Sequence, residues 1–423
     1  MESSSRPSAS WPTAEQHEKN KAYTCSFWRS LPFEKLENLA TGLRAVRCHA
    51  NRERYAQGSS AVVIELLYDD QEIWVARLTA PVDVCGGAVR ADKVARETEC
   101  EVSALRLVRA KTTIPVPTVH AYSAGYENEL GMPYVIMSAL QGATPYHIGL
   151  SEYLSHVRAE DLPLLDRYVG SLADCFMQLS TIQFDRIGSI YPDPSDTSKY
   201  VIGPLASNGL GPFDTAWDFY VACADKLEQK LLALPDDTPE QREGRALVLW
   251  LYRLGLGLLA DSPNNKGPFL FAHNDIGIQN TLVNKNGDIT GFVDWSHAGA
   301  FPVEYFASQP FDFTSNQSRT EPERLDYHHR FSAELERRER GALSRLPDDR
   351  RLSEWHSSPL AYLVGRIYPL MTGPDLCEEE AYAPLTARFV LGVEDASPFK
   401  KSVVFREWYA ATLRRIEARR QPE

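Results

Sequence analysis

The sequence lacks the features by which several large classes of protein are recognised. Its longest apolar stretch, residues 246–260, is interrupted by Arg253 and is shorter than the roughly 20 residues that a membrane-spanning helix needs. The 7 cysteines are odd in number and include no CxxC pair, so neither a disulfide framework nor a zinc finger is predicted. Buried thiols in a reducing cytosol are the simpler interpretation.

Positive charge is also scarce, because 45 Lys and Arg residues face 57 Asp and Glu residues and leave a formal net charge of −12. Non-specific nucleic-acid binding relies on a basic surface, so no nucleic-acid partner is expected. The first 16 residues have no apolar signal segment, and Glu2 argues against a transit peptide. We expect a disordered tail there, a cytoplasmic location, no membrane contact and no obligate protein partner.

Two nucleotide-binding motifs are missing or misplaced. The phosphate loop GxxxxGK[ST] is absent, so ATP binding by that route is not predicted. Residues 255–260 fit the dinucleotide fingerprint GxGxxA, but they end an apolar helical pattern, whereas a true fingerprint follows a strand and opens a helix. The pair His328-His329 with nearby acids could indicate a metal site, but a solvated helix surface is the preferred interpretation.

What the chain does contain is a change of pattern near residue 140. Before it, short strand-like runs and one charged helical segment follow in the order strand, strand, helix, strand, strand: 61–68, 72–78, 91–109, 118–122 and 133–139. After it, the pattern is mostly helical: 161–182, 215–234, 247–259 and 402–420. We therefore expect an α+β fold with a partly disordered and then helical extension over 1–50, a small lobe over 51–140 and a mainly helical lobe over 141–423.

One β-hairpin interrupts the helical part, and it is the one strong β signal predicted there. The pair Asn286-Gly287 favours a tight turn with positive φ, and strands are expected at 281–283 and 289–293. Residues whose numbers sum to about 573 then face one another. Asn280 is thereby placed opposite Val293.

Polar side chains gather at the open end of this hairpin. Asp294 follows the second strand, and Asp275, in the loop before the hairpin, can reach the same end. With Asn280 they offer the hard oxygen ligands that suit Mg²⁺ shared with substrate phosphates. The carboxylate left over could orient or deprotonate an attacking hydroxyl, which is the minimum that phosphoryl transfer needs. Each residue alone could equally satisfy its own backbone in a turn, but their joint spacing favours a site.

The spacing of this stretch reads His273-x-Asp275-x4-Asn280, followed by Asp294-Trp295. It resembles the catalytic signature of the aminoglycoside phosphotransferase and choline-kinase-like branch of the protein-kinase-like superfamily, especially its large fungal subfamily. The resemblance implies a bilobal fold, with an antiparallel sheet and one helix in the small lobe. It also implies Asp275 as catalytic base, Asn280 and Asp294 as Mg²⁺ ligands, and His273 as a brace of the loop.

The resemblance covers about residues 50–310 and extends to an ATP site. Arg77 is similar to the cation that binds phosphate, and Glu101 is similar to the helix glutamate that pairs with it. Residues 133–142 are similar to the hinge that receives adenine through backbone atoms, here those of Ser138, Ala139 and Leu140. The loop over the phosphates is implied at 56–61, where backbone N–H groups and hydroxyls would meet phosphate, and its residues are Gly58, Ser59 and Ser60.

Two features depart from the wider family pattern. Arg77 stands where a lysine is expected; it keeps the positive charge but is not interchangeable with a compact ammonium group. The loop at 56–61 has one glycine, where protein kinases have GxGxxG. Taken alone, Arg77 could be a solvated strand residue and Glu101 a helix surface residue.

The expected function is ATP-dependent transfer of the γ-phosphate to a hydroxyl of a small molecule, with ATP and Mg²⁺ as cofactors. The acceptor would be an amino alcohol, an aminoglycoside-like compound or a secondary metabolite, held by helical insertions that include 145–165, 190–225 and the region after 300. An alternative, motivated by Arg77 and the loop with one glycine, is a nucleotide-binding pseudokinase or assembly factor without turnover. A third interpretation is a metal-dependent hydrolase that uses His273, Asp275 and Asp294.

Overall fold

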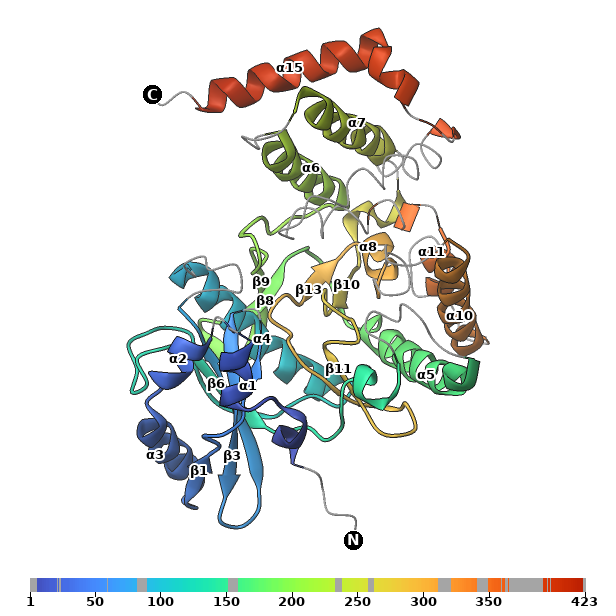
Figure 1. Cartoon of the computed structure of the whole chain (residues 1–423). Coiled ribbons are helices and arrows are strands. Elements are labelled where there is room, and N and C mark those ends of the chain that lie inside the picture. The colour runs from blue at the N-terminus through green and yellow to red at the C-terminus, as the bar shows by residue number, and fades with distance from the viewer. Residues whose placement is uncertain are drawn as a thin grey trace. The chain divides into compact units, whose positions relative to one another are not determined.

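The chain forms two compact units in the computed structural model (Figure 1). The described residues are 6–20, 22, 24–58, 60–81, 90–150, 159–232, 238–257, 262–310, 321–340, 349–358, 360–361, 364, 391–393, 395 and 397–420. Unit 1 comprises Met1–Ile182, Ser189–Gly209 and Ala272–Gly299, and unit 2 comprises Gln183–Gly188, Leu210–Phe271 and Ala300–Glu423. The lobe boundaries expected from the sequence remain a prediction.

A six-stranded sheet organises the first part of unit 1, in the order β1-β3-β4-β6-β5 with β2 paired to β3. All of these pairs are antiparallel. The strands are β1 (Cys48–Ala50), β2 (Ala56–Gln57), β3 (Ala61–Tyr68), β4 (Ile73–Thr79), β5 (Val119–Ser123) and β6 (Tyr134–Ser138). The four strand-like runs predicted in this region are confirmed, because β-branched and aromatic residues there fit a pleated, largely buried surface.

Helices cover this sheet. The long helix α4 (Ala91–Lys111) packs against β5 and β6, and it ends shortly before Pro115 and Pro117, which a helix does not easily continue through. Helix α3 (Phe33–Arg44) packs against β1 and β3 and buries Leu36 and Ala40 in the core. The predicted strand–strand–helix–strand–strand order is therefore observed.

Regular helical elements begin at Pro7, which corrects the expectation of a disordered tail over the first 16 residues for those that the structure describes. It forms η1 (Pro7–Ser10), α1 (Ala14–Lys19) and α2 (Cys25–Arg29). A reciprocal capping box between Thr13 and Gln16 starts α1. The ring of His17 then stacks on the buried Tyr55 with centroids 4.0 Å apart. No local pattern in the sequence predicts this packing between segments far apart in the chain.

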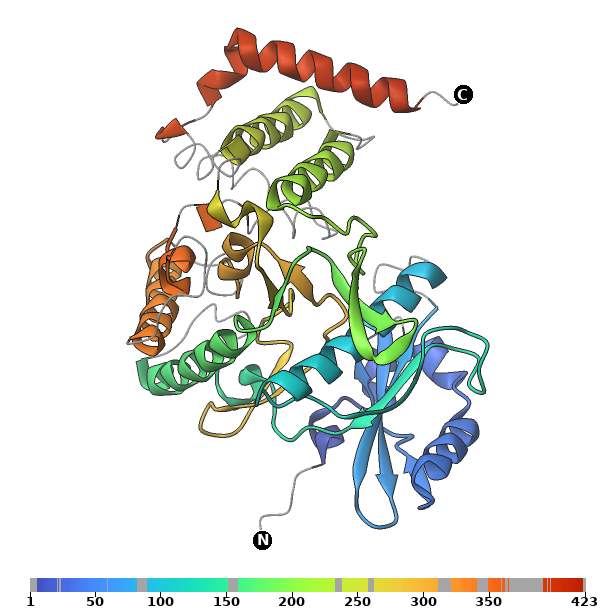
Figure 2. The same cartoon turned by 180° about the vertical axis from the view of Figure 1, so that it is seen from behind.

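The remainder of unit 1 holds η2 (Pro145–Ile148), η4 (Ala159–Asp161), α5 (Leu162–Leu179), and two hairpins: β8 (Ser189–Asp193) with β9 (Asp196–Gly203), and β11 (Thr281–Val283) with β12 (Ile289–Phe292). Helix α5 packs against β12 (Figure 2). The β8–β9 pair contradicts the expectation of a single strong β interruption and of a helical region over 190–225. The prolines at 192 and 194 weakened the strand signal in the sequence.

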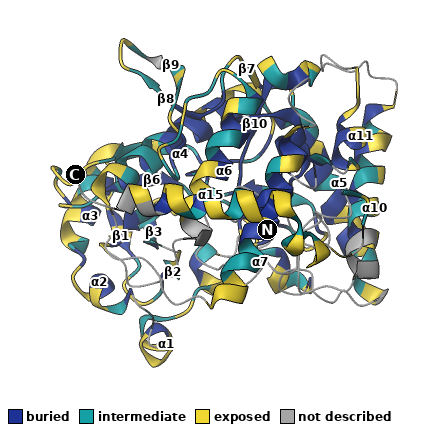
Figure 3. Ribbon diagram, turned by 90° about the horizontal axis from the view of Figure 1, so that it is seen from above, coloured by how far each residue is buried: buried dark blue, intermediate teal, exposed yellow. Residues whose placement is uncertain are grey.

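Unit 2 is mainly helical around a small sheet in the order β13-β10-β7. Its strands are β7 (Gln183–Phe184), β10 (Phe269–Ala272) and β13 (Gly299–Phe301), and its helices are α6 (Ala216–Leu232), α7 (Pro239–Leu256), η6 (Pro263–Lys266), α8 (Val303–Ala307), α10 (Glu321–Glu339), α11 (Leu352–His356), η7 (Ser397–Lys401) and α15 (Val403–Arg420). Helix α15 packs on α6 and α7 and leaves much of its surface exposed (Figure 3).

Several sequence-based interpretations can be checked against these elements. The α+β class with an antiparallel sheet is confirmed. The GxGxxA match begins in the last turn of α7 rather than between a strand and a helix, and its residues 258–260 lie outside the described residues. Four of the five described cysteines are buried, as expected. No described helix is long and apolar enough to cross a membrane.

Candidate active site

The β11–β12 hairpin has the register that the sequence predicted. Thr281 pairs with Phe292 and Leu282 with Gly291, and the N–H of Val293 donates to the carbonyl of Asn280 at 3.0 Å. The turn needs a glycine at Gly287, where φ is +87° and a Cβ would lie 2.9 Å from the carbonyl oxygen of Leu164. The Asn-Gly turn therefore fixes which residues meet at the open end.

Asp275 and Asn280 are brought together at that end. The Nδ2 of Asn280 donates to the backbone oxygen of Asp275 at 2.8 Å and to its carboxylate Oδ2 at 2.9 Å. Asn280 is buried, whereas Asp275 is only partly buried. Because the amide nitrogen is turned toward Asp275, the amide oxygen Oδ1 is the ligand atom that Asn280 can offer.

His273 braces the loop that carries Asp275. Its ring is fully buried, and burial lowers the pKa of His273 to about 4, so the ring is neutral near pH 7. One nitrogen, Nδ1, accepts from the N–H of Asp275 at 3.3 Å. The other, Nε2, lies 2.9 Å from the carbonyl oxygen of Val293 and must therefore carry the proton. The ring joins the loop before the hairpin to the end of its second strand.

Asp294 has an unusual backbone and an ionised side chain. Its φ is +61°, a left-handed conformation that aspartate tolerates better than most residues. Burial alone would raise the pKa of Asp294, but the charges of Arg77 and His297 outweigh it and the pKa is lowered. The hydroxyl of Ser296 donates to Oδ1 at 2.7 Å. Asp294 is thus held as a carboxylate in a fixed orientation.

Arg77 and Glu101 form the ion pair that the resemblance implied. The Nη1 of Arg77, on β4, lies 3.2 Å from the Oε2 of Glu101, on α4. Glu101 is 1% exposed. Burial opposes the charge on Arg77, but Glu101, Asp294 and Glu97 together raise the pKa of its guanidinium. Arg77 is therefore a charged residue between α4 and Asp294, and not a solvated strand arginine.

The loop at 56–61 is anchored at both ends. The N–H of Gly58 donates to the carbonyl of Ala61 at 2.8 Å, and the carbonyl of Ser60 accepts from the N–H of Ala80 at 2.8 Å. Ser59 lies outside the described residues. A Cβ at Gly58 would meet nothing closer than the Ala61 oxygen at 3.7 Å, so the fold itself does not require glycine there.

The three residues expected to form a hinge, Ser138, Ala139 and Leu140, differ in the backbone atoms that they can offer. The N–H of Ser138 donates to Thr118 at 2.9 Å, and the N–H of Ala139 donates to Ile73 at 3.2 Å. Among the described residues, the N–H of Leu140 has no acceptor. A hollow of 600 Å³ beside the hinge is lined by Ser138, Leu140 and residues between 109 and 118. Of the three hinge donors expected from the sequence, Leu140 alone keeps a free N–H in this part of the chain.

Sequence reasoning missed one pair in this region. The Nε2 of His297, three residues after Asp294, lies 3.2 Å from the Oε1 of Glu97 on α4. Glu97 precedes Glu101 by four residues and so lies on the same face of the helix. The four-residue spacing of the two glutamates is visible in the sequence and indicates a shared helix face. It does not indicate His297 as the partner of Glu97, because His297 lies 200 positions away in the chain.

The hydrolase interpretation finds no support in this geometry. Both ring nitrogens of His273 are engaged by backbone groups. No group of three or more His, Cys, Asp or Glu side chains in the described ranges is arranged to hold a metal ion. His328 stacks on His356 with ring centroids 4.4 Å apart instead of forming a metal site with its neighbour.

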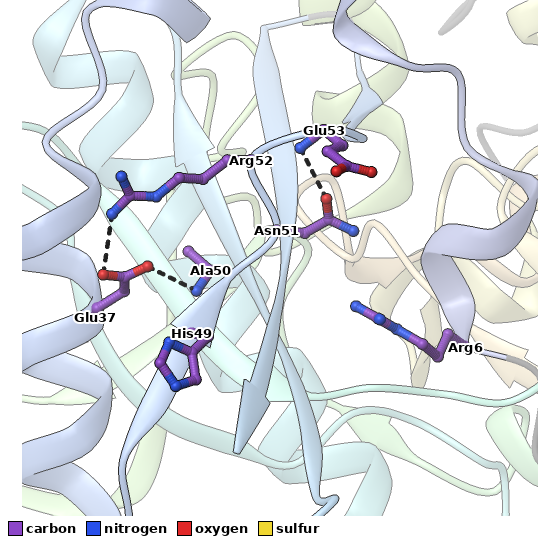
Figure 4. Close-up of a pocket in the computed structure, with 7 residues that line it drawn as sticks. All are labelled: Arg6, Glu37, His49, Ala50, Asn51, Arg52 and Glu53. Carbon is purple, nitrogen blue, oxygen red and sulfur yellow. Dashed lines mark hydrogen bonds and ion pairs between the residues drawn. The ribbon is translucent and has the colours of Figure 1, made fainter. Parts of the chain in front are cut away.

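Another hollow of unit 1, of 490 Å³, contains none of the predicted site residues (Figure 4). It is lined by Arg6, Glu37, His49, Ala50, Asn51, Arg52 and Glu53. Its polar groups bind one another: Glu37 accepts from the N–H of Ala50 at 3.0 Å and pairs with Arg52 at 3.1 Å. These contacts stabilise the loop after β1.

The chain is similar to known phosphotransferases. A model of the family described as "Phosphotransferase enzyme family" matches residues 52–305. One similar structure is a thermostable mutant of aminoglycoside phosphotransferase APH(4)-Ia, in a ternary complex with AMP-PNP and hygromycin B. It is 16% identical, has a TM-score of 0.50, and covers 84% of this chain and 97% of that chain. No match was found among the curated proteins.

Two further structures have lower scores. Macrolide 2'-phosphotransferase MphH from Brachybacterium faecium is 17% identical, with a TM-score of 0.44 and coverage of 86% of this chain and 99% of that chain. Amicoumacin kinase hAmiN, in complex with AMP-PNP, Ca²⁺ and Ami, is 11% identical, with a TM-score of 0.43 and coverage of 88% of both chains. The protein-kinase-like α+β fold expected from the sequence is confirmed.

Proposed function

The chain belongs to the phosphotransferase enzyme family, and on this premise we propose that it transfers the γ-phosphate of ATP to a hydroxyl group of a small molecule. The enzyme class, a small-molecule kinase, is the one that the sequence predicted, and the family confirms it. The observation that carries the detailed proposal is the contact of Asn280 with Asp275, at the end of the hairpin where Val293 pairs with Asn280 and Asp294 follows.

Asp275 is the proposed catalytic base. Its carboxylate is partly exposed, and Asn280 and the His273 brace hold its loop in place. In the proposed reaction the acceptor oxygen forms a bond to the γ-phosphorus as the bond from that phosphorus to the ADP oxygen breaks. The proton of the acceptor hydroxyl passes to Asp275.

Asn280 and Asp294 fit the requirements of a Mg²⁺ site. The amide of Asn280 presents Oδ1 because its nitrogen is bonded to Asp275. The carboxylate of Asp294 is ionised, with Ser296 on Oδ1. One carboxylate and one neutral oxygen suit an ion that takes its other ligands from water and phosphate. When bound, the ion would neutralise charge on the phosphate oxygens.

The nucleotide would be bound by three parts of unit 1. Arg77, held by Glu101, offers a planar fork of donors to phosphate oxygens. In the loop at 56–61, Ser60 would offer its backbone N–H and hydroxyl to phosphate; the N–H of Gly58 already donates to Ala61, and Ser59 lies outside the described residues. The free N–H of Leu140 is the hinge donor proposed for adenine. Ser138 and Ala139 would contribute carbonyl oxygens instead of donors. The AMP-PNP in the similar aminoglycoside phosphotransferase structure supports a nucleotide of this kind.

The acceptor is proposed to be a hydroxylated small molecule that carries an amine, such as an amino alcohol or an aminoglycoside-like compound. Hygromycin B in the similar structure supports this class. A cytoplasmic location is part of the proposal, since both ATP and reduced thiols belong there.

The test is a phosphoryl-transfer screen with labelled ATP against amino alcohols, aminoglycosides, sugars and secondary metabolites. With an accepted substrate, Asp275→Asn should lower kcat by about 10²- to 10⁴-fold, which is the usual contribution of a general base. The matched control is Asp288→Asn, in the hairpin turn, which removes the same charge from a residue paired with Arg167. Turnover by Asp275→Asn at the parent rate would remove the assigned role.

A second function, nucleotide binding without turnover, is motivated by Arg77 in place of lysine and by the single glycine of the 56–61 loop. Thermal shift with ATP does not separate the two functions, because any ligand of the native state raises the melting temperature. Labelled product with any acceptor in the panel excludes the second function. ATP binding without product across the whole panel supports it.

A further inference from the structure

Helix α4 carries a second carboxylate contact beside the Arg77–Glu101 pair. Glu97 and Glu101 lie one turn apart on the same face of the helix. Each contacts a basic side chain from another segment of the chain. Glu101 lies 3.2 Å from Arg77 of β4, and Glu97 lies 3.2 Å from His297. The helix thus contacts both the strand with the phosphate-binding arginine and the segment that follows Asp294.

A buried thiol lies between these two contacts along the same stretch. The Sγ of Cys100 is 3.1 Å from the carbonyl oxygen of Ala298 and 3.9 Å from that of Trp295. Cys100 is fully buried, so this contact is apolar packing with a weak hydrogen bond. Residues 295–298 therefore lie along α4, and the imidazole of His297 provides the ionic part of that contact.

The charge of His297 suits this position. Burial lowers the pKa of His297, but the hydrogen bond to Glu97 and the charges of Asp294 and Asp275 raise it further than burial lowers it. When protonated, the His297 imidazole is a second cation near Asp294, after Arg77. Glu97 also meets Lys93 at 3.5 Å on its Oε1, so the carboxylate has one partner on its own helix and one on the Asp294 segment.

We propose that His297 is a positioning residue for phosphoryl transfer: its contact with Glu97 fixes the segment of Asp294 to α4 independently of the Arg77–Glu101 pair. This inference rests on the proposed function, in which Asp294 is a metal ligand and Arg77 binds phosphate. In that function Arg77 presents donors to the nucleotide while its Nη1 remains beside Glu101. The His297–Glu97 contact is then a second link between α4 and the segment of Asp294.

The experiment compares His297→Leu, Glu97→Leu and the double variant with the parent. Partners that orient a metal ligand contribute about 10- to 100-fold to activity or metal affinity. We expect each single variant to lower kcat within that range, with the KM for the acceptor unchanged, because His297 does not touch the acceptor in this proposal. The double variant should be no slower than the slower single variant, because both remove the same contact.

A second readout does not depend on turnover. Binding of Mn²⁺ in the presence of a non-hydrolysable ATP analogue, followed by electron paramagnetic resonance, should weaken by about 10-fold or more in His297→Leu. His297→Gln keeps an Nε2 donor at the same position, so it should restore Mn²⁺ affinity to within about threefold of the parent. Lys93→Ala is the matched control, since it removes the other partner of Glu97 and leaves His297 in place.

The outcomes separate this inference from the proposed function. If the parent transfers no phosphate to any acceptor, the proposed function fails, and the Mn²⁺ measurement still tests His297. The inference is overturned if His297→Leu and Glu97→Leu keep parent kcat and Mn²⁺ affinity, if their losses add in the double variant, or if His297→Gln is as impaired as His297→Leu. Should His297→Leu fail to fold, Glu97→Leu and His297→Gln carry the same comparison.

Discussion

Replacing Arg77 by methionine tests the Arg77–Glu101 ion pair of the proposed nucleotide site. Methionine is unbranched and flexible enough to fill the space of the arginine stem, so the main loss is the positive charge. Glu101 remains behind at 1% exposure, without the guanidinium that lies 3.2 Å from its carboxylate. The fold must then either keep an isolated buried charge or bind a proton on Glu101.

The expected loss of stability follows from this geometry. Removing one partner of a buried ion pair costs about 3 to 5 kcal/mol. The Arg77 side chain is 17% exposed, so water reaches part of the site, and we expect a value near the lower end, about 3 kcal/mol. That is a large share of the roughly 5 to 15 kcal/mol by which folded domains are stable.

The loss should depend on pH. Burial raises the pKa of Glu101 more than Arg77 lowers it, and without Arg77 the folded pKa rises further. The folded variant then binds this proton more tightly than the unfolded chain, whose glutamates titrate near about 4.3. The stabilising protonation is complete below that pH and is lost as the pH rises through the higher folded pKa. The deficit of Arg77→Met should therefore be smaller at pH 5 than at pH 8.

Urea unfolding followed by tryptophan fluorescence measures this, with the parent, Arg77→Met, Glu101→Leu and the double variant at both pH values. The double variant should recover most of the loss, because no buried charge is left. Arg77→Lys is the control that keeps a positive charge. A loss below about 1 kcal/mol in Arg77→Met, or a double variant as unstable as Arg77→Met, would refute the buried-pair reasoning.

Three further substitutions test other parts of unit 1. Gly58→Ala should leave the urea midpoint unchanged, since the Cβ has space, but should weaken ATP binding by calorimetry about tenfold, or 1.4 kcal/mol, if the loop backbone meets phosphate. Arg6→Ala should lower the free energy of unfolding by about 1 to 3 kcal/mol. The buried Glu65 of β3 would still accept a hydrogen bond from the Ser8 N–H but would lose its ion pair with Arg6. An unchanged urea midpoint would contradict this. His273→Phe should cost about 1 to 3 kcal/mol near pH 7 through its lost backbone partners. The parent should also lose stability as the pH falls from about 6.5 to the folded His273 pKa of about 4, because over that range the unfolded chain protonates this histidine and the folded protein does not. Circular dichroism melts should show a shallower loss of stability with falling pH in His273→Phe than in the parent.

Local sequence was enough to predict the parts of this protein that depend on neighbours along the chain. The strand at Ala61–Tyr68 and the helix from Ala91 were readable because side-chain periodicity follows the backbone repeat. The hairpin register followed from Asn286-Gly287. The short spacing between Asp275 and Asn280 was enough to expect their contact.

Tertiary structure alone decided the contacts between distant segments. Glu97 meets His297 across 200 positions, and nothing in either local sequence specifies the other. The packing of His17 on Tyr55 is another contact between distant segments. So are the hydrogen bonds made by the N–H groups of Ser138 and Ala139, which leave only the Leu140 N–H without an acceptor among these three residues. Local patterns select an element and its buried face, whereas the partner on that face is chosen by the packing of the whole chain. For this reason local sequence was enough to propose residues for a phosphate site, and the fold determined which groups hold them in place.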